Sequence, residues 1–148
     1  MIKEVHIREI AKEDYKSIAE LTNQLGANIL SNTVSDQIVE IIRNPDHFAF
    51  VAIKDKRIVG YIHCFNAIRL TSKPFKEICG LIVNNEERKN GIGKLLVEKV
   101  ESLDNDSGKI RVRCNSKRES AHRFYANLKY SLSKQQKIFE KEITYNKY

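Results

Sequence analysis

The spacing of apolar residues changes along this chain, and the changes predict an alternation of strands and helices. Residues 3–8 alternate apolar and polar positions, as a half-buried strand does. Residues 13–25 place apolar side chains along one helical face, and Gly26 is a suitable stop. A second, short helix is expected over 35–43, after a loop over 27–34.

The middle of the chain predicts a hairpin followed by a central strand. Two apolar, β-branched runs flank Asp55 and Lys56, which marks a turn between strands, and the second strand is expected to reach about Leu70. Residues 74–83 are nearly all apolar towards their end, as expected at the centre of a sheet.

The second half continues the alternation. The expected elements are a charged loop over 84–90, a helix over 91–103, a turn over 104–108, a strand over 109–115, a helix over 117–128 and a terminal hairpin over 130–144. This order predicts an α/β fold with a mixed sheet. At 148 residues the whole chain, 1–148, is expected to be a single domain.

The composition of the chain bears on its cellular location and on association with membranes. No apolar run approaches the roughly 18 residues of a membrane span. The first ten residues lack the apolar stretch of a signal peptide. We therefore expect a cytoplasmic protein with no membrane partner.

The net charge of +7 is unevenly distributed. Residues 1–50 hold 5 Lys/Arg and 8 Asp/Glu, whereas residues 51–148 hold 21 and 11. This split suggests that one part of the molecule suits an anion and the other a cation, although counts this small also fluctuate. The basic residues are scattered and lack a ladder of stacking aromatics, so a nucleic-acid partner is not expected.

The cysteines and histidines show no spacing typical of a metal site, and no metal is predicted. The cysteines fall in runs predicted as strands, so buried free thiols are expected. The histidines are expected to be structural or exposed. The residues concerned are Cys64, Cys79, Cys114, His6, His47, His63 and His122.

A glycine-containing loop leads from the central strand into the next helix. The first N–H groups of a helix lack partners inside it, and with the helix dipole they form a site for anions. Gly91 and Gly93 have no side chain, so a diphosphate can approach the backbone closely. Arg88, Lys89 and Lys94 add positive charge. The loop is therefore a candidate phosphate site, with a plain helix start as the alternative.

Two better-known phosphate loops do not fit this segment. A P-loop needs glycine and Ser/Thr at the places that Arg88 and Leu95 occupy. The dinucleotide fingerprint needs a third glycine, where this chain has Leu96.

The loop resembles the signature of the GNAT-type N-acetyltransferase superfamily. The pattern of the whole chain, including residues 137–141, resembles the bacterial small-molecule, aminoglycoside-like branch of that superfamily. The signature is Gln or Arg, two residues, Gly, one residue, then Gly or Ala, after a central strand; residues 88–93 fit it. A second family segment fits residues 115–125 and 128–130, and the order of elements fits nearly the whole chain. Lys129 departs from the family, which usually has glycine there, and is expected to alter a turn.

The resemblance implies a mostly antiparallel central sheet flanked by about four helices, and an acetyl-CoA cosubstrate. The loop amides would hold the pyrophosphate, and the central strand would pair with the pantetheine arm where the sheet splays. Asn115 and Arg118 would contact the cofactor, or else act as ordinary helix caps. The implied cofactor-binding residues are Leu81, Ile82, Val83, Arg88, Lys89, Asn90, Gly91, Ile92, Gly93, Lys94, Asn115 and Arg118.

Direct acetyl transfer in a ternary complex requires a base for the amine, a stabiliser for the thioester oxygen and an acid for the departing thiolate. The resemblance implies Tyr125 as the acid, and packing on the apolar stripe is the alternative. Glu77 is the candidate base; an exposed carboxylate, one that holds a water or a substrate amine, and a water relay are the alternatives. The Val83 N–H is the candidate oxyanion stabiliser.

The acceptor is predicted to be a primary amine of a small, cationic molecule. Acidic residues gather in the part of the chain that borders the acceptor cleft in relatives, and they would attract such a molecule. A protein N-terminal or lysine acetyltransferase and a non-catalytic acyl-CoA sensor are the alternatives. A homodimer is compatible with the resemblance. The acidic residues are Glu13, Asp14, Glu20, Asp36, Glu40 and Asp46.

Overall fold

The computed structural model describes residues 4–103 and 108–144. They fall into two compact units, the first ending at Arg113 and the second beginning at Cys114. Most of the turn predicted over 104–108 lies outside the described residues, and the single domain over 1–148 stays a prediction.

The first unit contains a five-stranded sheet in the order β1-β2-β3-β4-β5. The first four strands pair antiparallel, and β5 pairs parallel to β4, so the predicted mixed, mostly antiparallel sheet is confirmed. The strands are β1 (His6–Glu9), β2 (His47–Lys54), β3 (Arg57–Ala67), β4 (Phe75–Val83) and β5 (Ile110–Val112).

The predicted hairpin joins β2 to β3. Asp55 and Lys56 have φ angles of 51° and 64°, the left-handed pair that a tight turn between twisted strands requires. The second strand ends at Ala67 rather than near Leu70. Ile68 and Leu70 are exposed, which shows that apolar character alone does not extend a strand.

Four α-helices and two short 3-10 helices occur in the described residues. The second helix was predicted to begin at 35 but begins at Ser31. Its polar first turn concealed the start, and the burial of Val34 and Ile38, four residues apart on one face, holds the helix against the sheet. The helices are η1 (Lys12–Asp14), α1 (Tyr15–Asn23), α2 (Ser31–Arg43), η2 (Asn85–Glu87), α3 (Ile92–Glu101) and α4 (Glu119–Asn127).

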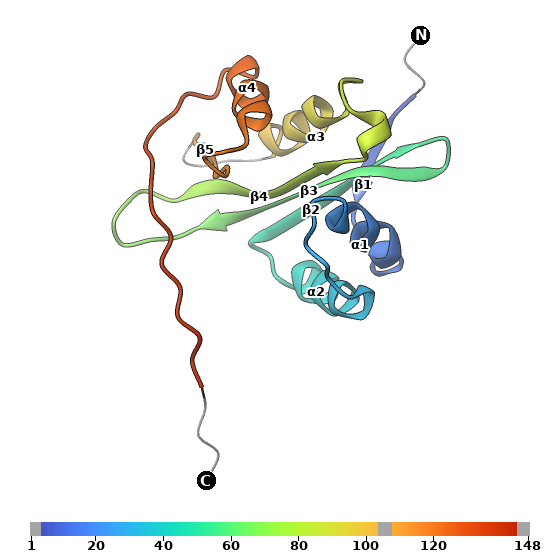
Figure 1. The fold of residues 1–148 in the computed structure, drawn as a ribbon, viewed down its shortest axis with the longest axis horizontal. Helices are drawn as coiled ribbons and strands as arrows, with labels where there is room; N and C mark the ends of the chain where they lie inside the picture. The colour runs from blue at the N-terminus through green and yellow to red at the C-terminus, as the bar shows by residue number, and fades with distance from the viewer. Residues whose placement is uncertain (1–3, 104–107, 145–148) are drawn as a thin grey trace. The chain divides into compact units, whose positions relative to one another are not determined.

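Helices cover both faces of the sheet in the first unit, with α1 and α2 on one side and α3 on the other (Figure 1). Ile18 and Ile38 pack in one buried cluster with Val51 of β2. The preceding residue, Phe50, faces α3, because neighbouring residues of a strand point to opposite faces. Its ring centroid lies 5.4 Å from Lys99 Nζ of that helix. The central strands are therefore buried on both sides.

A bulge interrupts β4. His63 of β3 pairs with Gly80, while the next residue, Cys64, pairs with Ile78, which leaves Cys79 as the extra residue. A bulge of this kind redirects a side chain out of the regular alternation. Cys79 is accordingly exposed in the middle of a largely buried strand.

The second unit consists of a turn, α4 and a segment without regular structure. The terminal hairpin predicted over 130–144 is wrong, because residues 131–144 form no strand and all are exposed. Leu132, Ile138 and Phe139 are among its exposed apolar residues. Alternating apolar residues make a strand only where a neighbouring strand accepts the backbone hydrogen bonds, and no such neighbour occurs in the described chain.

Candidate functional site

The outer edge of β4 is open over the stretch predicted to hold the pantetheine arm. β5 pairs with β4 only at Lys76, Glu77 and Ile78. Beyond Ile78, no other strand of the described residues pairs with this edge. Leu81 and Val83 are half-buried there. Their strand can therefore offer backbone groups to a ligand along one side.

The loop after β4 ends in a helix start that no side chain caps. Gly91 is the N-cap of α3, with φ 80°, a backbone angle that favours glycine. A Cβ atom built on Gly91 would meet nothing within 4 Å, so the space beside the backbone is open. Arg88, Lys89 and Lys94 around this end are exposed. The geometry fits the binding of an anion at the helix N-terminus.

Contacts within the first unit hold this loop in place. Glu87 accepts a hydrogen bond of 2.6 Å from Lys54 Nζ and one of 3.4 Å from Asn90 Nδ2. Arg88 Nε donates to the Val83 carbonyl at 3.4 Å. Because Lys54 pairs with Glu87, this carboxylate does not cancel the positive charge of the loop.

Glu77, the predicted base, lies in β4 and is 7% exposed. Its Oε1 accepts a hydrogen bond of 3.1 Å from Arg113 Nε. The alternative of an exposed carboxylate is therefore wrong. The carboxylate is held by an ion pair with Arg113 and lies on the same strand as Leu81 and Val83.

Asn115 and Arg118 lie in the second unit, at the turn that opens α4. Asn115 Oδ1 accepts from the Lys117 N–H at 2.9 Å, and its carbonyl accepts from the Arg118 N–H at 3.0 Å. Arg118 is the N-cap residue of α4 and makes no side-chain cap. The turn hydrogen bonds of Asn115 support the alternative that it is a structural residue.

Tyr125, the predicted acid, lies on α4 between two aromatic rings. Its ring centroid is 5.0 Å from that of Phe124 and 5.6 Å from that of Tyr130, both in edge contact. Burial is the main cause that raises the pKa of the Tyr125 hydroxyl above its ordinary value, and the thiol of Cys114 adds to the increase. The charge of Arg118 offsets part of it. The phenol is therefore protonated at neutral pH and is a weaker acid than a free tyrosine.

The first unit contains a row of three side chains in contact, Cys79, His63 and His47, that the sequence did not predict. Cys79 Sγ lies 3.1 Å from His63 Nδ1, and His63 Nε2 lies 2.9 Å from His47 Nδ1. Strand register brings these residues together, and the sequence holds no local signal of it. Of the cysteines predicted to be buried, Cys64 is buried, Cys79 is exposed and Cys114 is intermediate. The prediction was thus wrong for Cys79, since the bulge turns it outward.

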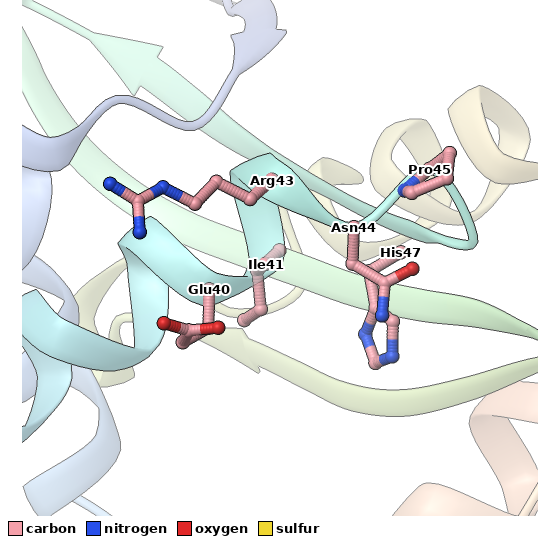
Figure 2. Close-up of a pocket in the computed structure, with 6 residues that line it drawn as sticks. All are labelled: Glu40, Ile41, Arg43, Asn44, Pro45 and His47. Atoms are coloured by element: carbon pink, nitrogen blue, oxygen red, sulfur yellow. The ribbon is translucent and has the colours of Figure 1, made fainter.

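His47 also lines a pocket of about 400 Å³ at the end of α2 (Figure 2). Glu40, Ile41 and Arg43 come from the last turns of the helix, and Asn44, Pro45 and His47 from the residues that follow. Figure 2 shows that both charged side chains extend from the helix at one end of the pocket, with His47 at the other. A carboxylate, a guanidinium and an imidazole thus share one concave surface.

Neither a metal-binding cluster nor a membrane-spanning helix emerges from residues 4–103 and 108–144. No group of three or more His, Cys, Asp or Glu side chains there could hold a metal ion. None of the described helices combines the length and apolar character needed to cross a bilayer.

Comparison with solved structures finds the same fold in several proteins. An aminoglycoside N-acetyltransferase, AAC(6')-Iy, solved in complex with CoA, has a TM-score of 0.82 at 16% identity, over 95% of this chain and 96% of that one. The 6'-N-acetyltransferase AAC(6')-Ih from Acinetobacter baumannii has a TM-score of 0.77 at 15% identity, over 95% and 100%. A transcriptional regulator from Bacillus halodurans has a TM-score of 0.73 at 20% identity, over 93% and 99%. At sequence identities of 15–20%, the structural similarity establishes the fold alone.

Comparison with curated protein sequences gives no match. Comparison with protein families matches residues 11–148 to the acetyltransferase (GNAT) domain. This match spans both units and includes both sequence motifs. The chain therefore belongs to the GNAT acetyltransferase family, and the predicted class of acetyl-CoA-dependent N-acetyltransferase is confirmed.

Proposed function

We propose that this enzyme moves the acetyl group of acetyl-CoA to a primary amine of a small, cationic acceptor by direct transfer in a ternary complex. One observation carries the proposal. The unpaired edge of β4 over 81–83 leads into the uncapped N-terminus of α3 at Gly91. An extended ligand with amide groups and a diphosphate suits this succession of a strand edge and an anion site.

The proposed cofactor residues make different kinds of contact with different parts of acetyl-CoA. Leu81 and Val83 offer backbone hydrogen bonds to the amides of the pantetheine arm, while Ile82 between them pairs with Tyr61 of β3. The N–H groups from Gly91 onwards receive the diphosphate, with exposed cations around them. Asn115 and Arg118, at the turn before α4, are assigned to contacts with the cofactor, and the Oδ1 of Asn115 also accepts the Lys117 N–H within the turn.

The catalytic roles follow from the needs of aminolysis. Glu77 takes a proton from the acceptor ammonium, directly or through water, and the Val83 N–H stabilises the charge that develops on the thioester oxygen. Tyr125 protonates the departing thiolate. The raised pKa of Tyr125 keeps it protonated well above neutral pH, so its donor form is present throughout the physiological range.

The pocket beside α2 is a candidate acceptor site of mixed charge. Its lining carries one carboxylate, Glu40, and one guanidinium, Arg43, so its charge alone does not select a cation. Asp14, another residue of the acidic N-terminal third, is instead bound to Arg8 at 2.8 Å and 2.9 Å. The aminoglycoside acetyltransferases of the same fold give small polyamines as the first acceptors to test. The cytoplasmic location, the homodimer and the lack of a nucleic-acid partner stay predictions.

Calorimetry with acetyl-CoA tests the cofactor site. The wild type should bind, and a double change of Arg88→Glu and Gly91→Val should abolish binding, because it reverses a charge and places a branched side chain on the helix start. Gly26→Val is the matched control, since Gly26 has a similar φ of 82° and open space around it but lies outside the loop. Equal affinities in all three proteins would contradict the proposal.

Detection of released thiol over a panel of amines tests the reaction. Aminoglycosides, polyamines and peptides with free N-termini or lysines should be compared at equal concentration. Release with small polyamines supports the proposal, and release with peptides alone favours a protein acetyltransferase. If acetyl-CoA binds but no amine is acetylated, the chain is an acyl-CoA sensor.

A further inference from the structure

The line of Cys79, His63 and His47 has a chemistry that the proposed acetyl transfer does not use. The three residues come from β4, β3 and β2 and are joined by contacts of 3.1 Å and 2.9 Å. The ring of His47 also stacks on Phe65, with centroids 5.4 Å apart. A thiol beside an imidazole whose second nitrogen is held by a third group has the arrangement of nucleophile, base and orienting residue.

We propose that Cys79 is an acyl-accepting thiol, which takes an acetyl group from a thioester with His63 as the base and His47 as a positioning residue. The thiol is exposed, because the bulge in β4 turns it out of the sheet. A thioester can therefore reach the sulfur of Cys79. It cannot reach that of Cys64, which is buried.

The hydrogen-bond pattern supplies the base in the correct form. For His63 Nδ1 to accept the thiol proton, Nε2 must carry the ring hydrogen and donate it to His47 Nδ1. The carbonyl of His63, 3.4 Å from Cys79 Sγ, is a second acceptor for the same thiol hydrogen. Burial lowers the pKa of His63 to about 4, and the neighbouring His47 contributes to the shift. The ring is therefore neutral at pH 7, but it is a weaker base than free imidazole.

The thiol needs this base. Partial burial of the sulfur raises the pKa of Cys79 to about 11, so that only about one thiol in ten thousand is ionised at pH 7. The proton must therefore leave as the sulfur attacks, and His63 Nδ1 is the group placed to take it.

The step balances without any further reactant. A bond forms between Cys79 Sγ and the acyl carbon while the thiol proton passes to His63 Nδ1. The bond between that carbon and the donor sulfur then breaks, and the departing thiolate recovers the proton from His63. One thioester replaces another, so the exchange is close to neutral in free energy and can run in both directions.

The position of Cys79 suits acetyl-CoA as the donor, and this part rests on the proposed function. A diphosphate at Gly91 and an arm along 81–83 direct the acyl end back along β4. Cys79 lies two residues before Leu81, about 7 Å along the strand.

Mass spectrometry of the full chain tests the inference without any acceptor amine. The protein is incubated separately with acetyl-CoA and with S-acetyl-N-acetylcysteamine, a thioester that lacks the nucleotide. We expect one acetyl group, mapped to Cys79 and removed by hydroxylamine at neutral pH. Cys79→Ala should abolish it, and Cys114→Ala should leave it unchanged. His63→Gln should slow it by about 100-fold, since glutamine cannot take up the proton.

The outcomes separate this inference from the proposed function. Acetylation of Cys79 by the short thioester but not by acetyl-CoA upholds the thiol and contradicts the cofactor site. Absence of acetyl on Cys79 with both donors overturns the inference, whatever the amine panel shows. A wild-type rate in a folded His63→Gln protein overturns the role of the base, and the mapping on the wild type does not depend on any variant.

Discussion

Lys129 ends α4 with a backbone angle that a side chain rarely adopts. Its φ is 71°, in the left-handed region, and its N–H donates to the Ala126 carbonyl at 3.0 Å. The family usually has glycine at this place, and the structure gives the reason, because glycine reaches this angle without strain. Lysine therefore keeps the turn at a cost in conformational energy.

Replacing this lysine should stabilise the protein. Lys129→Gly is expected to raise the free energy of unfolding by about 1 kcal/mol, since the strain of the left-handed angle is removed. Urea unfolding measures the change. Lys134→Gly, in the exposed segment after the helix, is the control and should bring no gain. A loss of stability at position 129 would contradict the strain.

Asp14 shows how a buried carboxylate is kept charged. Burial alone would raise its pKa, but the hydrogen bonds from Arg8 and the Ala11 N–H, with the charge of Arg8, outweigh burial and lower it. Because the pKa in the folded state is depressed, the stabilisation is present above the unfolded value of about 3.9 and is lost as the pH falls through the folded value.

Asp14→Asn should therefore lower the free energy of unfolding at pH 7 by about 2 kcal/mol, since the charged acceptor of Arg8 is removed. Urea unfolding at pH 7 and at several values below pH 4 measures the effect. The gap between variant and wild type should narrow in acid. A gap that does not depend on pH would show that the carboxylate charge is not the source.

Glu77 and Arg113 allow the catalytic role to be separated from the ion pair. Both Glu77→Gln and Arg113→Gln break the bond of 3.1 Å, but only the first removes the carboxylate. If Glu77 is the base, its variant should lose about 100-fold in kcat and the Arg113 variant much less. Steady-state kinetics with an accepted amine decide between them. Equal losses would assign Glu77 to structure.

At the scale of elements, the start of α3 couples a backbone angle to ligand binding. Gly91 and Gly26 have φ angles of 80° and 82°, and both have open space around the absent side chain. A methyl group there acts through backbone strain alone. The two glycines therefore form a matched pair, one at the proposed diphosphate and one at a plain turn.

Gly91→Ala and Gly26→Ala should each lower the free energy of unfolding by about 1 kcal/mol. Only Gly91→Ala should also weaken acetyl-CoA binding, because it displaces the N–H groups at the helix start. Thermal unfolding and calorimetry on both variants provide the two measurements. Equal affinities would show that the diphosphate does not lie on this backbone.

Some elements followed from local pattern, and others did not. The hairpin at Asp55 and Lys56 and the helix after Gly91 were predicted, because turn residues and apolar periodicity are local signals. The early start of α2 was missed, since burial of Val34 decides it. The false hairpin over 130–144 had the correct alternation but no neighbouring strand.

At the scale of the whole molecule, charge is the property that most affects a polyanionic cofactor. Residues 51–148 carry 21 basic and 11 acidic side chains, and they contain the loop at Gly91. Surface charges act over a distance of about 10 Å at 0.1 M salt and much less at higher salt. Part of the affinity for CoA should therefore depend on ionic strength.

The dissociation constant of CoA should rise roughly three- to tenfold between about 0.05 M and 0.5 M salt. Calorimetry at the two concentrations measures it. Pantetheine, which lacks the phosphates, is the control and should bind equally at both. A cofactor affinity that does not change with salt would contradict a site built on the charge of the loop.

The sequence by itself determined the family, the class of reaction, the mixed sheet and the segment that offers an anion site. These depend on residues close together in the chain, whose spacing is visible in the sequence. The tertiary structure alone decided which strand edge is open, that Glu77 is buried against Arg113, and that Cys79 faces outward beside His63. Strand register and a bulge set those contacts between residues far apart in the chain, and no local pattern encodes them.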